Sequence, residues 1–167
     1  MSTLPCRDFH GEIHNIPKEE ISARASVYGV IFNDIHDKVL LVKHFDGYDF
    51  PGGGVKAGQK LNEALAREIA EETGFELDTS SLKLLDVSTD LFFHNFKNRA
   101  FQTILIYYQA TLAKKARGAT DKSASESNYM GDAEWVALDQ IPAIKFYNAV
   151  DNAALIKQAL AEVVWIR

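Results

Sequence analysis

The chain has 167 residues, of which 47% are hydrophobic and 25% charged, and its net charge at pH 7 is −5. This length predicts a single domain over residues 1–167, and the acidic balance argues against nucleic acid or anionic membranes as partners. The only cysteine, Cys6, excludes an intrachain disulfide and a multi-cysteine zinc site. No apolar run reaches the length of a membrane span and the N-terminus does not resemble a signal peptide, so we expect a cytoplasmic protein.

The first half of the chain begins with a polar stretch and continues with short strands. We expect residues 1–20 to form an irregular N-terminal extension. Residues 25–32 and 38–43 are rich in β-forming side chains and flank a turn-like segment, which predicts two strands. A third strand at 48–50 should end at Pro51 and the glycines after it, since proline cannot donate to a strand ladder.

The second half contains a helix, several strands and a second helix. Residues 61–73 follow a helical pattern, and Gly74 is placed to end that helix in a left-handed conformation. Strands are expected at 82–94, 101–112 and 134–138, and a terminal helix at 147–166. The run 101–112 is apolar on both alternating faces, so it should lie in the centre of a sheet. This order of elements predicts an α/β fold.

A long polar stretch, residues 114–132, precedes the last strand. Loops longer than about 12–15 residues in a compact domain are usually functional or without fixed structure. The lysine, serine, glycine and aspartate residues of this stretch leave little to bury, which favours a surface loop. A flap over a bound substrate is the alternative.

Three glutamates of the predicted helix, Glu68, Glu71 and Glu72, have spacings that place them on one side of it. Like charges at these spacings destabilise a helix by about 0.2–0.5 kcal/mol per pair. The glutamates border the apolar stripe of the helix, which contains Leu61, Leu65 and Ile69. Unpartnered carboxylates there would be costly, and Mg²⁺ or Mn²⁺, which prefer oxygen ligands, would compensate them. A salt-bridge network with Arg67 is the competing explanation.

Four glycines precede this helix, namely Gly52, Gly53, Gly54 and Gly58. A glycine-rich loop lets the backbone approach a ligand closely and leaves carbonyl oxygens accessible to a cation. Such loops are often simple turns. A loop of this kind that leads into three glutamates is rarer and favours the metal site.

The segment 53–75 resembles the signature of the Nudix hydrolases, G-x5-E-x7-R-E-U-x-E-E-x-G-U, in which U is a bulky aliphatic residue. The matching positions are Gly53, Arg67, Glu68, Ile69, Glu71, Glu72 and Gly74, with Phe75 at the last bulky position. Gln59 departs from the pattern, which has glutamate there. A looser likeness extends over residues 22–165 and implies an α/β/α sandwich with a mixed β-sheet.

The resemblance implies hydrolysis of a diphosphate linkage in a nucleoside diphosphate derivative, with water attacking phosphorus and Mg²⁺ or Mn²⁺ as the cofactor. It makes Glu68 and Glu72 the main metal ligands, with Glu71 and the Gly52 carbonyl as further ligands. It also gives Arg67 the role of orienting the glutamates. A surface salt bridge is the structural alternative for this arginine.

Two further positions bear on catalysis. Gln59 keeps an acceptor oxygen but lacks the charge of the usual glutamate, so this auxiliary residue would position water or an arginine less strongly. The source of the general base differs among family members. A helix glutamate or Glu126 of the long loop is the candidate here, although a solvated loop acid is the plainer interpretation of Glu126.

Basic and aromatic residues outside the signature are candidates for substrate binding. Arg24 is the first candidate for a phosphate contact, since arginine binds phosphate oxygens in a bidentate manner, and Lys43 and Lys56 are weaker ones. A wall for stacking a nucleobase is expected from aromatic side chains, namely Phe92, Phe93, His94, Tyr28 and Tyr107. Aromatic residues at strand spacing are also typical of a core, and His94 is expected to be structural.

Absent features narrow the subclass. No proline follows the signature at the spacing typical of ADP-ribose hydrolases, and Cys6 lies outside the region of the catalytic cysteine in isopentenyl diphosphate isomerases. Nucleoside triphosphates, including oxidised ones, and nucleotide sugars remain as substrate classes. The alternatives are a nucleotide-binding or regulatory module with weak or no catalysis, suggested by Gln59, and a structural acidic helix in an unrelated domain. Many relatives are dimers, so a homodimer is one expected assembly, although no stretch marks an interface.

Overall fold

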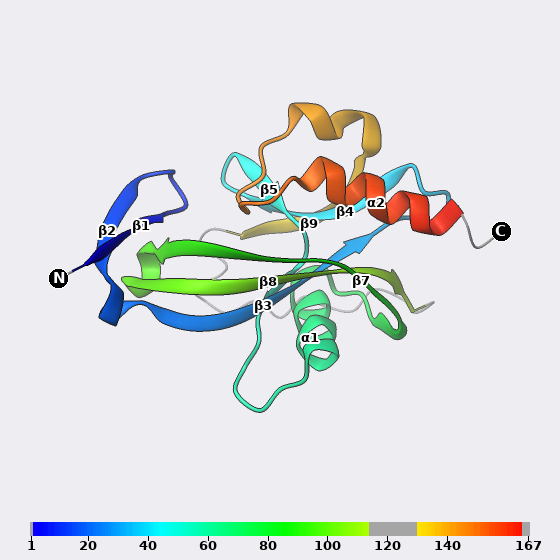
Figure 1. Cartoon of the computed structure of the whole chain (residues 1–167). Coiled ribbons are helices and arrows are strands. Elements are labelled where there is room, and N and C mark those ends of the chain that lie inside the picture. The colour runs from blue at the N-terminus through cyan, green and yellow to red at the C-terminus, as the bar shows by residue number, and fades with distance from the viewer. Residues whose placement is uncertain (1, 114–129, 165–167) are drawn as a thin grey trace.

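The computed structural model describes residues 2–113 and 130–164, in which strands are enclosed between two α-helices (Figure 1). The strands are β1 (Thr3–Arg7), β2 (Ile13–Pro17), β3 (Ser22–Ile31), β4 (Lys38–His44), β5 (Gly47–Asp49), β6 (Gly52–Gly54), β7 (Leu77–His94), β8 (Arg99–Leu112) and β9 (Met130–Ala137). The helices are α1 (Leu61–Thr73) and α2 (Asn152–Val164), and the 3-10 turns are η1 (Lys18–Glu20), η2 (Asn95–Lys97) and η3 (Leu138–Ala143).

The strands form two sheets. The larger has the order β2-β1-β7-β8-β3-β6 and is mixed, because β3 runs parallel to β8 while β7 is antiparallel to it. The smaller sheet, β5-β4-β9, is antiparallel. In Figure 1, α1 lies on one side of the strands and α2 on the other, while the β1–β2 hairpin lies at one end. This arrangement confirms the predicted α/β/α sandwich with a mixed sheet.

Two hydrophobic clusters fill the spaces beneath the two helices, and β8 contributes side chains to both clusters. Ile106 and Ala110 belong to the cluster that contains Leu65 and Ile69 of α1. The intervening Tyr107, which is fully buried, belongs to the cluster that contains Leu155 and Ile156 of α2. Successive side chains of a strand point to opposite faces, so a strand between two cores is apolar throughout. The central position predicted for 101–112 is therefore confirmed.

The N-terminal prediction is wrong, because residues 1–20 contain β1, β2 and η1 instead of an irregular stretch. In β1, Leu4 is half-buried and Cys6 fully buried, whereas Thr3 and Pro5 are exposed and Arg7 is half-buried. Five pairs, from Thr3 with Pro17 to Arg7 with Ile13, join the strands of this hairpin. The buried set consists of few side chains, so the alternation is weak in the sequence.

Other boundaries also differ from the predictions. Strand β9 begins at Met130, four residues before the predicted 134 and inside the stretch 114–132 expected to be a loop. The glycines expected to end a strand form β6, which pairs antiparallel with Ser26–Tyr28 of β3. Strand β7 begins at Leu77, five residues before the predicted start at 82. Helix α2 begins at Asn152 instead of 147, because the backbone N–H groups of Tyr147 and Asn148 bond to residues of β5. No helix in the described part of the chain is long and apolar enough to cross a membrane.

Candidate active site

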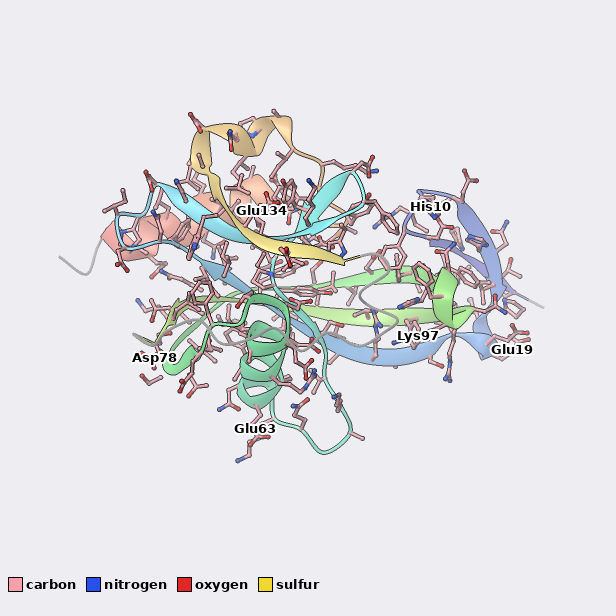
Figure 2. The ribbon with its side chains drawn as sticks, turned by 180° about the vertical axis from the view of Figure 1, so that it is seen from behind. His10, Glu19, Glu63, Asp78, Lys97 and Glu134 are labelled. Atoms are coloured by element: carbon pink, nitrogen blue, oxygen red, sulfur yellow. The ribbon has the colours of Figure 1, made fainter. Side chains whose placement is uncertain are left out.

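Helix α1 directs its glutamates unequally between the interior and the solvent. Glu68 and Glu72 are buried, with 8% and 7% of their surface exposed, and the Glu71 side chain is 32% exposed. Glu63 lies on the outer side of the helix (Figure 2), where its carboxylate accepts a hydrogen bond from the Lys60 backbone N–H at the N-cap. The helix ends at Gly74 with a φ of 70°. The exposed fractions confirm the prediction that the three signature glutamates border the buried face, with Glu71 at its edge.

The glycine strand β6 lies directly against the two buried carboxylates. The Gly52 N–H donates to Glu72 Oε2 at 2.8 Å. A Cβ atom at Gly53 would lie 2.7 Å from Glu68 Oε1, closer than a real side chain approaches. A Cβ atom at Gly52 would meet the Val27 carbonyl at 2.1 Å. The bare backbone at Gly52 and Gly53 is therefore a cradle that leaves room for the two carboxylates, and the Gly52 N–H holds Glu72 at the sheet.

Arg67 joins the glutamates to the loop that precedes the helix. Its Nη2 lies 2.8 Å from Glu68 Oε1 and donates to the Gly54 carbonyl at 3.0 Å, while Nη1 donates to Glu71 Oε2 at 3.0 Å. Burial opposes the charge of the guanidinium, but Glu68 and Glu71 outweigh this effect and raise the pKa of Arg67 above its usual value. The arginine thus fixes the orientation of two carboxylates and is more than a surface salt bridge.

Gln59 occupies the loop between β6 and α1. Its Oε1 accepts from the Lys56 backbone N–H at 3.2 Å and from Arg67 Nη2 at 3.4 Å. A neutral amide serves both bonds, so the side chain ties the loop to the arginine. Among the described residues, no three Asp, Glu, His or Cys side chains converge in the arrangement of a preformed metal cluster.

A cavity of about 150 Å³ opens beside the cradle and includes Gly53 and Gly54 in its wall. Of the residues predicted to bind substrate, Arg24 and Phe92 line it, together with Tyr28 and His94. Its other described lining residues are Phe9, Ser26, Asp49, Asp90, Thr103, Leu105, Tyr147 and Asn148. The cavity therefore connects the glycine cradle of β6 to an aromatic and polar wall.

The structure does not bring every predicted residue to this cavity. Lys43 is exposed on β4 and is absent from the lining, and Lys56 is exposed in the loop before α1. Phe93 points to the other face of β7, where it stacks on His14 with ring centroids 4.2 Å apart. Tyr107 is fully buried in the core and stacks on Tyr28. Glu126 lies outside the described residues.

Arg24 is held in place from two sides. Its Nε donates to Thr103 Oγ1 at 3.0 Å, and its guanidinium lies 4.6 Å from the centroid of the Phe101 ring. These contacts come from β8, which pairs with β3 in register at Arg24 and Thr103. The remaining guanidinium nitrogens are available to an anion in the cavity, which is the chemistry expected of a phosphate contact.

Several cavity residues were not predicted from the sequence, and Asp49 is the most unusual of them. Burial raises the pKa of Asp49 to about 7, although backbone N–H groups of Asn148 and Tyr147 and the charge of Arg7 act in the opposite direction. The Asn148 N–H donates to Asp49 Oδ1 at 3.1 Å. The Asp49 side chain is 17% exposed, and such a largely enclosed carboxyl at the end of a short strand has no local sequence signal, because its environment comes from distant segments.

His94 lies at the aromatic end of the cavity. Burial, with the charges of Lys97 and Arg24, lowers the pKa of His94 to about 4, so the ring is neutral at physiological pH. Its ring makes edge contacts with Phe9, Phe92 and Phe96 at centroid distances of 5.5, 6.2 and 6.2 Å. The ring therefore acts as a member of an aromatic cluster, consistent with the structural role expected for it.

Comparison with known proteins places this site in a family. The model of the NUDIX domain matches residues 23–158. The chain belongs to the Nudix family. The match covers most of the chain and includes the cradle, the signature helix and most of the cavity. The predicted enzyme class, a Nudix pyrophosphohydrolase, is confirmed at this level.

Solved structures show the same fold at low identity. The NUDIX domain of NrtR from Shewanella oneidensis, complexed with ADP ribose, is 20% identical, with 88% of this chain and 92% of that chain covered and a TM-score of 0.61. An ADP-ribose pyrophosphatase from Streptococcus suis is 16% identical, with 84% and 91% covered and a TM-score of 0.57. A MutT protein from Methanosarcina mazei Go1 is 19% identical, with 86% and 97% covered and a TM-score of 0.56. These likenesses support the fold and leave the substrate open.

Proposed function

We propose that this Nudix protein uses Mg²⁺ or Mn²⁺ to hydrolyse a diphosphate linkage in a nucleoside diphosphate derivative. One observation carries the proposal. The buried carboxylates of Glu68 and Glu72 lie on a glycine cradle that forms part of the wall of a cavity containing Arg24 and Phe92. The proposed cation site therefore adjoins the cavity wall that carries the proposed phosphate contact and the proposed surface for a flat ring.

The residues at the cradle suit a hard divalent cation. The donors are carboxylate and carbonyl oxygens, which Mg²⁺ and Mn²⁺ prefer, and the Gly53 backbone leaves the Glu68 carboxylate uncovered by any Cβ atom. Glu68 and Glu72 would hold the metal, with Glu71 and the Gly52 carbonyl as further ligands. When bound, such ions neutralise the diphosphate and lower the pKa of a bound water.

Side chains of the site orient the metal-binding carboxylates and the substrate. Arg67 bonds to Glu68 and Glu71 and fixes both carboxylates toward the cradle. Arg24 offers its guanidinium to the phosphate groups, and the aromatic wall near Phe92 receives the ring of the nucleoside. A carboxylate of α1 or Glu126 accepts the proton of the attacking water. The products are two phosphate-bearing fragments from one P–O–P linkage.

A panel of candidate compounds determines the substrate class. Nucleoside triphosphates, oxidised ones included, and nucleotide sugars are the expected substrates. ADP-ribose belongs in the panel because two similar structures are named for it. The full-length chain is incubated with each compound in Mg²⁺, Mn²⁺ or EDTA, and the products are identified by chromatography.

The decisive variant is Glu72→Gln, which keeps the size of the side chain and removes its charge. We expect it to lower kcat by at least about 100-fold, the scale of losing one well-placed electrostatic contact with the transition state. Glu63→Gln is the matched control, because Glu63 lies on the outer side of α1. Equal activity of both variants, or no metal-dependent turnover of any compound, would exclude the proposal.

A nucleotide-binding or regulatory module with weak catalysis is the second candidate, favoured by the neutral Gln59. This module would bind nucleotides in calorimetry without releasing product. Gln59→Glu restores the charge usual at that position, next to Arg67. An increase in turnover on this substitution would indicate that Gln59 limits the rate in the present chain.

A further inference from the structure

The N-terminal hairpin lies outside the part of the chain that matches the family, yet it forms part of the cavity. The family match begins at residue 23, whereas the hairpin comprises β1 and β2 at residues 3–17. Its first strand extends the large sheet next to β7 through a parallel pair between Arg7 and Phe92. The hairpin is therefore joined to the strand that carries the aromatic wall.

Phe9, at the tip of the hairpin, lines the cavity directly. Its ring centroid lies 4.7 Å from that of Phe92, with an interplanar angle of 77°, and 5.5 Å from that of His94. Two rings at this angle present one edge and one face, which is a favourable aromatic arrangement. Phe9 and Phe92 together supply the two phenyl rings of the cavity wall.

The tip is held by a buried carboxylate next to Phe9. Asp8 is 2% exposed and accepts hydrogen bonds from the His10 and Glu12 backbone N–H groups at 2.8 and 2.9 Å. His14 Nε2 lies 3.0 Å from this carboxylate, and Asn95 Nδ2 of η2 donates to it at 2.7 Å. Figure 2 shows His10 of the tip and Lys97 of η2 at the same end of the molecule.

Burial opposes ionisation of Asp8, but the hydrogen bonds from Asn95, His14 and the two backbone N–H groups outweigh it and hold the pKa of Asp8 well below its usual range. The bond from Asn95 links the hairpin to the turn that directly follows β7. The carboxylate therefore stays charged at physiological pH and fixes the residue next to Phe9.

Arg7 attaches the hairpin to the polar side of the cavity. Its Nη2 donates to the Tyr147 carbonyl at 3.0 Å and lies 3.7 Å from Asp90 Oδ2. Tyr147 and Asp90 both line the cavity. Three consecutive residues, Arg7, Asp8 and Phe9, thus contact the cavity wall or the turn beside it.

We infer that the hairpin is a specificity element and that Phe9 is a specificity-determining residue against which the nucleobase of the substrate packs. The inference rests on the proposed function for its ligand class, a nucleotide, and adds a residue from outside the family match. A nucleobase is a flat heteroaromatic ring that can stack on the rings of Phe9 and Phe92. A sugar or a lone phosphate has no π face and cannot make this contact.

Binding of products tests this without requiring turnover. Calorimetry measures the Kd of AMP, GMP, CMP and UMP, with ribose 5-phosphate as the probe that lacks a base, for the full chain and for Phe9→Leu. We expect Phe9→Leu to weaken the best-bound nucleoside monophosphate by about 3- to 10-fold and to leave ribose 5-phosphate unchanged. Phe75→Leu is the matched control, because Phe75 is a half-buried aromatic residue packed on Trp135 away from this cavity.

A second variant separates the specificity role from a merely structural one. Asp8→Asn keeps the size of the side chain but removes the charge that holds the tip, so the same selective loss should occur to a smaller extent. Circular dichroism and thermal unfolding establish that each variant is folded. An equal loss for ribose 5-phosphate and the nucleotides, no loss for Phe9→Leu, or no nucleotide binding by the unaltered chain would overturn the inference.

The same measurements distinguish this inference from the proposed function. If the chain binds nucleoside monophosphates through Phe9 but hydrolyses no compound of the substrate panel, the hydrolytic proposal fails and the assignment of the cavity stands. If it hydrolyses nucleotides with a base preference that Phe9→Leu does not change, the hydrolytic proposal stands and the role assigned to Phe9 fails.

Discussion

The two ends of the cavity are built in different ways. At the cradle, α1 and the glycine strand β6 come from one stretch of 23 residues, 53–75, and the residue before it. At the aromatic end, the wall combines the tip of the N-terminal hairpin, β7 and the segment at 147–148. A site built from neighbouring residues keeps a recognisable spacing, whereas one built from distant segments leaves no pattern. The cradle end is therefore recognisable in the sequence, whereas the aromatic end becomes visible only in the structure.

The cradle end should be sensitive to a single methyl group. Gly53→Ala would place a Cβ atom 2.7 Å from Glu68 Oε1, so the carboxylate must move. Because a displacement of about 1 Å costs about 100-fold in rate, we expect a kcat loss of that size. Steady-state kinetics on the best substrate of the panel measures it.

Gly54→Ala is the matched control for this prediction. A Cβ atom there would have nothing within 4 Å, and the residue lies next to Gly53 in the same strand. We expect its kcat to stay within about threefold of the unaltered chain. Similar losses of kcat in both variants would contradict the special role of Gly53 next to Glu68.

The middle of the cavity should respond through KM. Arg24→Ala removes a guanidinium that lines the cavity, and charge-assisted contacts of this kind contribute about 1.5–3 kcal/mol, which corresponds to an increase in KM of at least about 10-fold. Lys43→Ala removes a basic residue that is exposed and absent from the lining, so its KM should not change. A larger effect at Lys43 than at Arg24 would place the phosphate contact elsewhere.

The polar wall should respond in stability and not in kinetics. The pKa of Asp49 is raised to about 7 in the folded chain from 3.8, so the folded state binds more protons between these values and stability falls as pH rises through this window. Urea unfolding at pH 5 and pH 8 should show a loss of stability that is about 2–3 kcal/mol larger for the unaltered chain than for Asp49→Asn, which cannot ionise. An equal pH dependence in both proteins would contradict a buried, proton-binding Asp49.

The contrast between the ends also explains what could be predicted from the sequence. Glu68 and Glu72 were placed correctly because helical periodicity fixes which residues share a face. Arg24 followed from its charge at the start of a strand. Asp49 and Phe9 were not predicted, because their environments are created by tertiary contacts. The bond between Arg7 and the Tyr147 carbonyl, for example, joins residues 140 positions apart.

The prediction of residues 1–20 as irregular failed for a related reason. The burial of β1 depends on pairing with β2 and β7, and only Cys6 of that strand is fully buried. A short amphipathic strand with one buried residue resembles a polar extension when read alone. That this segment forms a hairpin becomes evident only when its partner strands are known.

The position of β1 next to β7 has a consequence for the edge of the large sheet. Without the hairpin, the N–H and C=O groups of β7 near Phe92 would lie at the margin of the large sheet, beside apolar aromatic rings. Such a margin is a template for strands of other molecules. A shortened chain that begins at residue 23, where the family match begins, would expose it. Strand β1 therefore covers the edge of β7 at Phe92, where the two strands pair.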